Sequence, residues 1–192
     1  GQAMSGLDAL LTLRKTANLV LGIKASINDY LVLAAGRALA RHPDVNVQLH
    51  GDAVHHFPHA DIAVAVASPK GLVTPIIRQA DRMTLPQLAA ATASQIDKAK
   101  SGRLSWEDLD GGTFTISNLG MFGIDEFDAV INPPQGAILA VGRARREAVE
   151  TEDGAIDFAT RINLTLSVDH RAIDGAAGAQ FLATLKTMIE DP

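Results

Sequence analysis

The chain contains no cysteine. Disulfide bridges, thiolate metal sites and a cysteine nucleophile are therefore excluded together, and the absence is compatible with a reducing compartment without requiring one. An excess of basic residues is lacking too, because 17 lysines and arginines stand against 22 aspartates and glutamates. The net charge of -5 argues against nucleic acid as the main partner.

Long hydrophobic runs are also missing. No stretch of the sequence is long enough to predict a transmembrane helix, and the start, GQAMSGLDALL, lacks the basic region and the apolar run of a signal peptide. Internal repeats and low-complexity linkers are not visible. What remains is a chain of 192 residues with 47% hydrophobic and 20% charged residues, which is long enough for one domain with a substantial core.

Hydrophobic spacing predicts helices and strands that do not alternate strictly. Helices are predicted at residues 7–19, 26–41 and 84–100 and after Asp174, and two of them begin with a capping box, Ser26 with Asp29 and Thr84 with Gln87. Strands are predicted at residues 45–57, as a hairpin around Gly51 and Asp52, and at 61–68, 72–77, 114–117, 136–142, 148–150 and 156–168. This order favours an α/β fold in which helices cover a mixed sheet.

The most informative stretch is DHRAIDGAAGA at residues 169–179. It follows the alternating segment INLTLSV and precedes an alanine-rich run with helical spacing, so His170 is predicted in a strand-to-helix turn, where a rigid scaffold can aim its imidazole. Asp174 can fix the turn, and Gly175 supplies a bend that most residues resist. A lone histidine in such a turn is more often structural than catalytic, and the motif by itself leaves both roles open.

Further motifs occur in a consistent order along the chain: ADIAVAVASPKG (60–71), GLVTPIIRQAD (71–81), GGTFTISNLGMFGIDEFDAVINPPQGAILAVG (111–142) and LSVDHRAIDGAAGAQFLATLKTMIEDP (166–192). With the HxxxDG signature formed by His170, Asp174 and Gly175, they resemble the catalytic core domain of dihydrolipoamide acyltransferases of 2-oxo acid dehydrogenase complexes. Chloramphenicol acetyltransferases share the signature. The resemblance covers most of residues 28–192 and implies a chloramphenicol acetyltransferase-like, coenzyme A-dependent acyltransferase fold.

The resemblance also implies a reaction and roles for three residues. An acyl group would move between the thiols of dihydrolipoamide and coenzyme A, both supplied by substrates. His170 would be the general base, with its ring bonded to its own main-chain carbonyl, and Asp174 would cap the last helix and hold the loop. Ser117, in FTISNLG, would stabilise the oxyanion and face His170 of a neighbouring subunit; from its spacing alone, Ser117 is more simply a serine that caps a turn. Residues that contact coenzyme A remain unassigned.

Acetyl is the expected acyl group, because SNLGMFG and INPPQGAILAVG look most like acetyltransferase cores; branched-chain acyl comes next and succinyl third. The alternatives are a non-catalytic scaffold component of such a complex and a chloramphenicol-type small-molecule acetyltransferase. A separate, flexibly linked domain would carry the lipoyl group. The other partners would be the decarboxylase and the dihydrolipoamide dehydrogenase of the complex, which would be a pyruvate or branched-chain 2-oxo acid dehydrogenase complex. The expected location is a bacterial cytoplasm or the mitochondrial matrix. No membrane or nucleic-acid partner is expected.

Assembly is implied in the same way. Relatives form homotrimers that associate through their C-terminal ends into cores of 24 or 60 subunits, and Met188 and Ile189 would pack across a two-fold contact. Such cores usually begin with a basic helix and a strand ahead of the residues that SGLDALLTLR resembles. We therefore expect residues 1–192 to be one acyltransferase catalytic core domain without that helix and strand, and without a lipoyl or subunit-binding domain. The family's arginine partner for Asp174 would lie in the missing segment.

Two features imitate other sites. His50, His55, His56 and His59 form a cluster, but they fall on a predicted hairpin with alternating faces and no carboxylate with metal-ligand spacing joins them, so we expect no metal. The sequence DKA at 97–99 imitates a lipoyl attachment site. Because Lys98 lies in a predicted helix rather than at the tip of a hairpin, we expect no lipoylation there.

Overall fold

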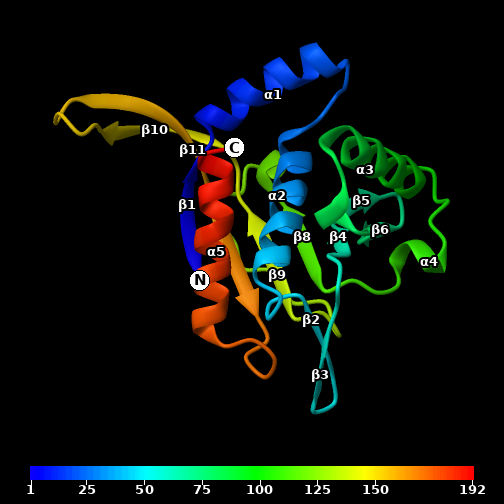
Figure 1. Cartoon of the computed structure of the whole chain (residues 1–192). Helices are drawn as coiled ribbons and strands as arrows, with labels where there is room; N and C mark the ends of the chain where they lie inside the picture. Colours follow the sequence, from blue (N-terminus) through cyan, green and yellow to red (C-terminus); the bar gives the residue numbers. More distant parts are fainter.

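A seven-stranded mixed sheet organises the chain, which a computed structural model describes over residues 1–192 (Figure 1). The helices are α1 (Asp8–Leu21), α2 (Ile27–Arg41), α3 (Leu85–Lys100), α4 (Trp106–Leu109) and α5 (Gly175–Glu190), with the 3-10 helices η1 (Ala80–Arg82) and η2 (Gly120–Phe122). The strands are β1 (Gln2–Gly6), β2 (Val47–His50), β3 (Ala53–His56), β4 (Ile62–Val64), β5 (Val66–Ser68), β6 (Gly71–Val73), β7 (Ile76–Ile77), β8 (Phe114–Asn118), β9 (Ala137–Val141), β10 (Arg145–Glu150) and β11 (Ile156–Val168).

The strand order in the main sheet is β1-β11-β9-β8-β4-β7, and β10 pairs with the outer part of β11. The pairs β4–β8 and β8–β9 are parallel, and the other pairs of the sheet are antiparallel. The predicted mixed sheet is thereby confirmed. Two small antiparallel pairs, β2 with β3 and β5 with β6, stand outside it.

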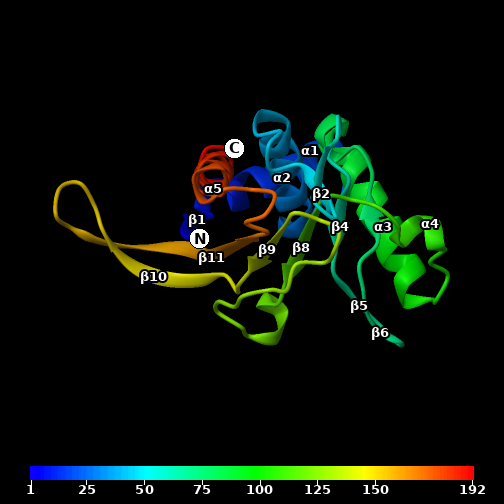
Figure 2. The same ribbon diagram turned by 90° about the horizontal axis from the view of Figure 1, so that it is seen from below.

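The helices cover one face of this sheet. Figure 2 shows α1, α2, α3 and α5 on the same side of the strands, while residues 119–132 cross the other side. The core lies between sheet and helices, where the rings of Phe114 on β8 and Phe181 on α5 are 5.4 Å apart and both side chains are fully buried. The predicted helices therefore cover one face of the sheet only, and the irregular segment 119–132 lies over the opposite face of β8, β9 and β11.

Both predicted capping boxes are formed. The amide of Asp29 donates to Ser26 Oγ at 3.1 Å and the amide of Ser26 donates to Asp29 Oδ2 at 3.0 Å, so that α2 begins where the sequence placed it. Thr84 and Gln87 make the same exchange at the start of α3. Each cap satisfies amides that the first turn of a helix leaves unpaired, and its loss typically costs about 1 kcal/mol.

The strand predicted at 61–68 is divided between two sheets. β4 pairs in parallel with β8, and the amide of Ala65 still donates to the carbonyl of Ile116. Beyond that point β5 leaves the main sheet and pairs with β6 instead. The alternating apolar pattern of residues 61–68 cannot reveal this break, because the pattern has the same two-residue period in β4 and in β5.

The strand β1, the short helix α4 and the 3-10 helices η1 and η2 were not predicted from the sequence. The short helix α4 begins with its own capping box, formed by Ser105 and Asp108. β1 lies directly ahead of α1, includes the first two residues of the SGLDALLTLR segment, and pairs with β11 from Gln2 to Gly6. The five residues of β1 carry little apolar signal, and only pairing with the long strand β11 makes them a strand.

The last helix contributes to the core. Ile189 is buried there and is not available for a contact with another chain, which corrects the expectation for that residue. Met188 is half-buried and lines a surface cavity of about 510 Å³ together with Leu10, Leu13 and Tyr30. In the whole structure no helix combines the length and the apolar character needed to cross a membrane.

Candidate active site

The residues around His170 form a tight turn between β11 and α5. The amide of Asp169 donates to the carbonyl of Gly136 at 2.8 Å, and the carbonyl of Asp169 accepts from the amides of Ala172 and Ile173, each at 2.9 Å. Ile173 is buried in the core and anchors the far side of the turn. His170 therefore occupies a position whose backbone is fixed before and after it.

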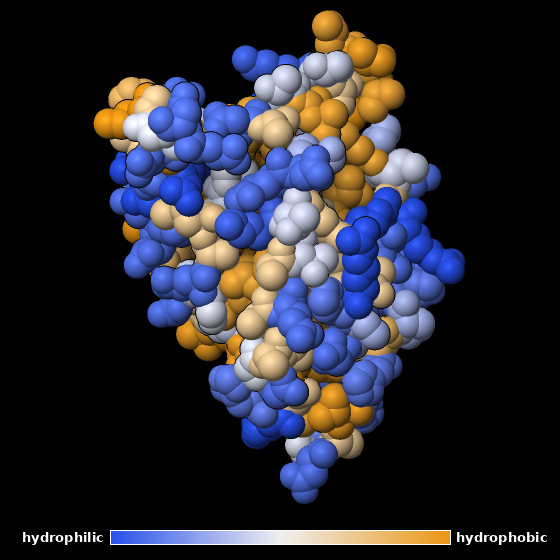
Figure 3. All heavy atoms as spheres, turned by 60° about the vertical axis from the view of Figure 1, so that its left-hand side comes forward, coloured by the Kyte–Doolittle hydropathy of each residue, from blue (hydrophilic) through white to orange (hydrophobic).

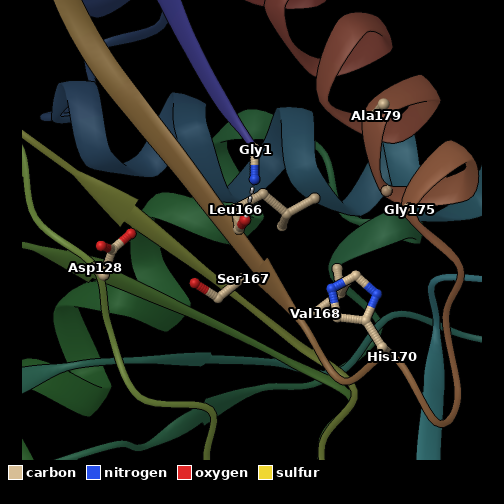
Figure 4. A pocket seen from close by; sticks show the side chains of 9 residues that line it. Gly1, Asp128, Leu166, Ser167, Val168, His170, Gly175 and Ala179 are labelled. Atoms are coloured by element: carbon tan, nitrogen blue, oxygen red, sulfur yellow. Dashed lines mark hydrogen bonds between the residues drawn. The ribbon is translucent and has the colours of Figure 1, made fainter.

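The imidazole of His170 is exposed and points into a cavity of about 330 Å³ between β11 and α5 (Figure 4). Val168 and Gly175 border the ring, and Asp128 and Ser167 lie farther along the same cavity. Neither ring nitrogen is hydrogen-bonded to another residue of the chain, whereas Asp169 and Arg171 on either side bond each other.

Asp174 ends the turn and starts α5. Its backbone is extended, and its carboxylate accepts a hydrogen bond of 2.7 Å from the amide of Ala177. This is the predicted N-cap contact. No arginine or lysine lies within ion-pair distance of Asp174, so its carboxylate has only the helix N-terminus as a partner within this chain.

Ser117 lies near the carboxyl end of β8, one residue beyond the last pair that β8 makes with β4. The β8 register pairs Ser117 with Ala140 of β9. Alternation along the strand places Ile116 in the core beneath the helices and Ser117 on the opposite face, where it is half-buried. The Ser117 hydroxyl has no hydrogen-bond partner within the chain, while the next residue, Asn118, accepts from the amide of Gly120 at 2.8 Å.

The structure does not bring His170 and Ser117 together within one chain. Val168 pairs with Ala137, which pairs with Phe114, so β11 ends beside the beginning of β8. Ser117 is three residues farther along β8 and two strands away, which separates it from Val168 by about 14 Å from strand geometry. His170 lies beyond that end of β11, still farther from the hydroxyl.

Sequence reasoning missed Asp128 and Ser167 as residues that line the same cavity as His170. Ser167 alternates onto the face opposite the core residues Leu166 and Val168, and the crossing segment 119–132 carries Asp128 to it. Alternation in LSV could have placed Ser167 on that face. No local signal could have placed Asp128 there, because it lies 42 positions from His170 in the chain.

The histidine cluster that resembles a metal site and the lysine that resembles a lipoyl attachment site make contacts with neighbouring side chains. The rings of His50 and His55 stack with centroids 4.6 Å apart, and His59 Nδ1 lies 3.3 Å from Asp81 Oδ2. No group of three or more histidine, aspartate and glutamate side chains is arranged to hold a metal. Lys98 lies within helix α3, as predicted, with its ammonium 3.5 Å from Asp108.

Comparison with known proteins agrees with this arrangement. A family model described as 2-oxoacid dehydrogenases acyltransferase (catalytic domain) matches residues 4–192. The dihydrolipoyllysine-residue acetyltransferase component of the pyruvate dehydrogenase complex from Zymomonas mobilis is 47% identical over 189 residues, which are 97% of this chain and 43% of that protein. The corresponding component from Rickettsia bellii is 45% identical over 96% of this chain and 45% of its own length.

Solved structures show the same fold. The dihydrolipoamide acetyltransferase of Azotobacter vinelandii, studied for the role of a serine, a histidine and an asparagine in its catalytic mechanism, and the cubic core of a pyruvate dehydrogenase multienzyme complex each match with a TM-score of 0.93 and 34% identity. Both matches cover all of this chain and 80% of the other. Chloramphenicol acetyltransferase, at 15% identity, a TM-score of 0.62 and coverage of 99% and 85%, shares the fold alone.

The chain spans less than half the length of the relatives from Zymomonas and Rickettsia. Within that part, the agreement extends from β1 through the HxxxDG turn to the end of α5. The chain belongs to the family of 2-oxoacid dehydrogenase acyltransferase catalytic domains.

Proposed function

We propose that this chain is the acetyl-transferring catalytic core of a pyruvate dehydrogenase complex and exchanges acetyl between coenzyme A and dihydrolipoamide. The observation that carries the proposal is a pair of polar groups without partners, the His170 imidazole and the Ser117 hydroxyl, within a chain whose relatives are described as acetyltransferase components. Acetyl is preferred over branched-chain acyl because those relatives are acetyltransferases.

His170 acts as the general base in this reaction. An ordinary thiol has a pKa of about 8.5 and an ordinary imidazole about 6.5, so full proton transfer in water is uphill by roughly 2.7 kcal/mol. A positioned imidazole offsets this cost by accepting the proton while the sulfur attacks the thioester carbon. His170 then returns the proton to the departing thiolate. The exposed ring, free of bonds to its own chain, is available for both steps.

Ser117 donates to the oxyanion that develops when the thioester carbonyl is attacked. Loss of one such donor typically costs about 3 kcal/mol of transition-state stabilisation. Because the strand register separates Ser117 from His170 of the same chain, the complete site combines His170 of one subunit with Ser117 of a neighbour. The active unit is therefore an oligomer, which we propose to be a homotrimer.

Asp174 has a structural role at the site. It caps α5 and thereby fixes the downstream end of the His170 turn. In the Azotobacter relative, the histidine and the asparagine whose catalytic role was studied are four positions apart, as are His170 and Asp174 here. The shared spacing supports this assignment, and the difference between Asp and Asn leaves the capping capacity intact.

Apolar surface on the chain suits assembly with further copies. Figure 3 shows apolar side chains gathered at the end of the molecule where α1 lies, and Leu19, Val20 and Leu21 are exposed there, Leu19 by 84%. Exposed patches of this kind commonly mark interfaces. A cubic core is described for one structural relative, and we propose an assembly of trimers for this chain, of 24 or 60 subunits.

The proposed partners follow from the complex. A lipoyl domain carries the dihydrolipoyl arm to the site, and the decarboxylase and dihydrolipoamide dehydrogenase act before and after it. Some relatives come from bacteria and two are described as mitochondrial, so we propose a bacterial cytoplasm or a mitochondrial matrix as the location.

The test is acetyl transfer from acetyl-coenzyme A to dihydrolipoamide, with isobutyryl-coenzyme A as the competing donor. We expect a higher kcat/KM for acetyl, by roughly 10- to 200-fold for the extra methyl groups. Higher efficiency with isobutyryl would reassign the acyl group. No transfer with either donor by the assembled protein would favour a scaffold role.

A further inference from the structure

Two oppositely charged side chains flank His170 and bind each other. Arg171 Nε donates to Asp169 Oδ1 at 3.0 Å, and Arg171 Nη2 donates to Asp169 Oδ2 at 2.7 Å. The amide of Arg171 also donates to Asp169 Oδ1, at 3.1 Å. The contact is a two-pronged guanidinium–carboxylate pair, the geometry in which arginine recognises a carboxylate best.

The pair closes the turn that carries His170. The carbonyl of Asp169 accepts from Ala172 and Ile173, while its amide donates to Gly136. Asp169 therefore has hydrogen bonds at its amide, its carbonyl and both carboxylate oxygens, and together these bonds fix the turn at residues 169–173. His170 is the residue enclosed by this set of bonds.

The imidazole makes no hydrogen bond to the side chain or backbone of any other residue in the chain. A base that must meet a sulfur at a defined angle then depends on its backbone for direction, and a displacement near 1 Å can cost on the order of a hundredfold in rate. Asp128 and Ser167, the other polar groups in the cavity, lie farther from the ring than its own turn (Figure 4). The Asp169–Arg171 contact is the only side-chain link between residues adjacent to His170.

We propose that Asp169 and Arg171 form a clamp that positions the His170 turn for proton transfer. The proposal deepens the acyltransferase function proposed above and rests on it. Both are positioning residues, because neither is assigned a contact with the reacting atoms. The hydrogen bonds from Arg171 hold the pKa of the Asp169 carboxyl below its usual range, so the clamp is charged at every pH at which thiol transfer is measured.

A contribution of the Asp169–Arg171 ion pair to the stability of the whole fold is a weaker explanation for this contact. The Arg171 side chain is 76% exposed, and exposed ion pairs contribute little to the free energy of unfolding. Arg103 makes a comparable exposed contact with Asp97, with a distance of 2.6 Å and 62% exposure, after α3 and on a different part of the fold. Arg103 therefore offers a matched control for removal of a paired, exposed arginine.

The experiment compares Arg171→Ala, Arg171→Lys and Arg103→Ala in the assembled protein, measuring kcat, KM for both thiols and Tm. In Arg171→Ala we expect kcat to fall roughly ten- to a hundredfold with KM nearly unchanged. Tm should stay at the parent value in both alanine variants. Arg171→Lys should recover part of kcat, since an ammonium keeps the charge but lacks the two-pronged geometry. A parent-like kcat in Arg171→Ala, or equal losses in Arg103→Ala, would overturn the clamp.

A second readout needs no activity. The amides of Ala172 and Ile173 are protected by their bonds to Asp169, and we expect faster hydrogen exchange of both in Arg171→Ala but not in Arg103→Ala. Unchanged exchange would refute the clamp whatever the kinetics. A parent protein without acetyl transfer would count against the proposed function, while the exchange result would still decide whether the turn is clamped.

A double-mutant cycle tests whether the two residues act as one unit. Asp169→Asn, Arg171→Ala and the double variant should each lower kcat by a similar factor, because breaking either side of the contact already releases the turn. If the loss of kcat in the double variant equalled the product of the two single losses, the two residues would act independently, which would contradict the clamp.

Discussion

The two halves of the proposed site are built differently. Ser117 sits on β8, an interior strand whose hydrogen bonds to β4 and β9 hold it from both sides. His170 sits in a turn after β11, held by a few local bonds around Asp169. The difference suits the two roles, since an oxyanion donor works by being fixed before the charge develops, whereas a base must reach a proton on one sulfur and return it to another.

The charge around the two halves also differs. Asp169, Arg171 and Asp174 are in the His170 turn, and Asp128 shares its cavity. The residues next to Ser117 are neutral, and Asn118 uses its amide to hold the following turn. A hydroxyl in neutral, half-buried surroundings gives a stronger hydrogen bond to an oxyanion than one exposed to water. The two halves of the proposed site therefore differ in charge as well as in construction.

Removing the base should have the largest effect. His170→Ala is expected to lower kcat by about 10²- to 10⁴-fold, since proton transfer in the transition state is lost. Tm should not change, because the ring is exposed and has no hydrogen bond to the chain. His56→Ala, which removes another exposed histidine, serves as the control. A loss below tenfold would remove His170 from proton transfer.

Removing the donor should have the next largest effect. Ser117→Ala is expected to lower kcat by about 10²- to 10³-fold with little change in KM for coenzyme A, because the hydroxyl is needed mainly in the transition state. Steady-state kinetics of this variant and of Ser94→Ala, an exposed serine on α3, make the comparison. Equal turnover in the two variants would show that Ser117 is not the donor.

Mixing the two inactive chains tests whether the halves come from different subunits. Co-assembly of His170→Ala with Ser117→Ala chains should restore activity at about a quarter of the interfaces, where an intact histidine meets an intact serine. Sites contained within one chain would remain inactive at every mixing ratio. Transfer assays on particles reassembled together, compared with particles mixed after assembly, distinguish these outcomes.

The smallest effect is expected at the start of α5. Asp174→Ala should lower the free energy of unfolding by about 1 kcal/mol, because the amide of Ala177 loses its acceptor. Asp174→Asn should remain near the parent, since asparagine caps equally well. Urea titration of both variants measures the difference. If the asparagine variant were as unstable as the alanine variant, Asp174 would owe its role to its charge and not to the cap.

Local chemistry explains which elements were predicted well. α2 and α3 begin at residues whose side chains pair with amides three positions away, so a few adjacent residues decide the boundary. β1 could not be found in this way, because its stability comes from pairing with residues 161–165, far along the chain. The break between β4 and β5 depends in the same manner on distant pairing, because β4 pairs with β8 whereas β5 pairs with β6.

The sequence by itself determined the identity of the reactive groups, the cap at Asp174 and the turn that holds His170, because these depend on residues within a few positions of one another. Tertiary structure alone decided where the groups lie. The register of β11 with β9, and of β9 with β8, places the turn and Ser117 at a distance that no side chain of one subunit spans. Strand register is set by packing among distant segments, so only the folded chain could show that His170 and Ser117 of one chain lie far apart.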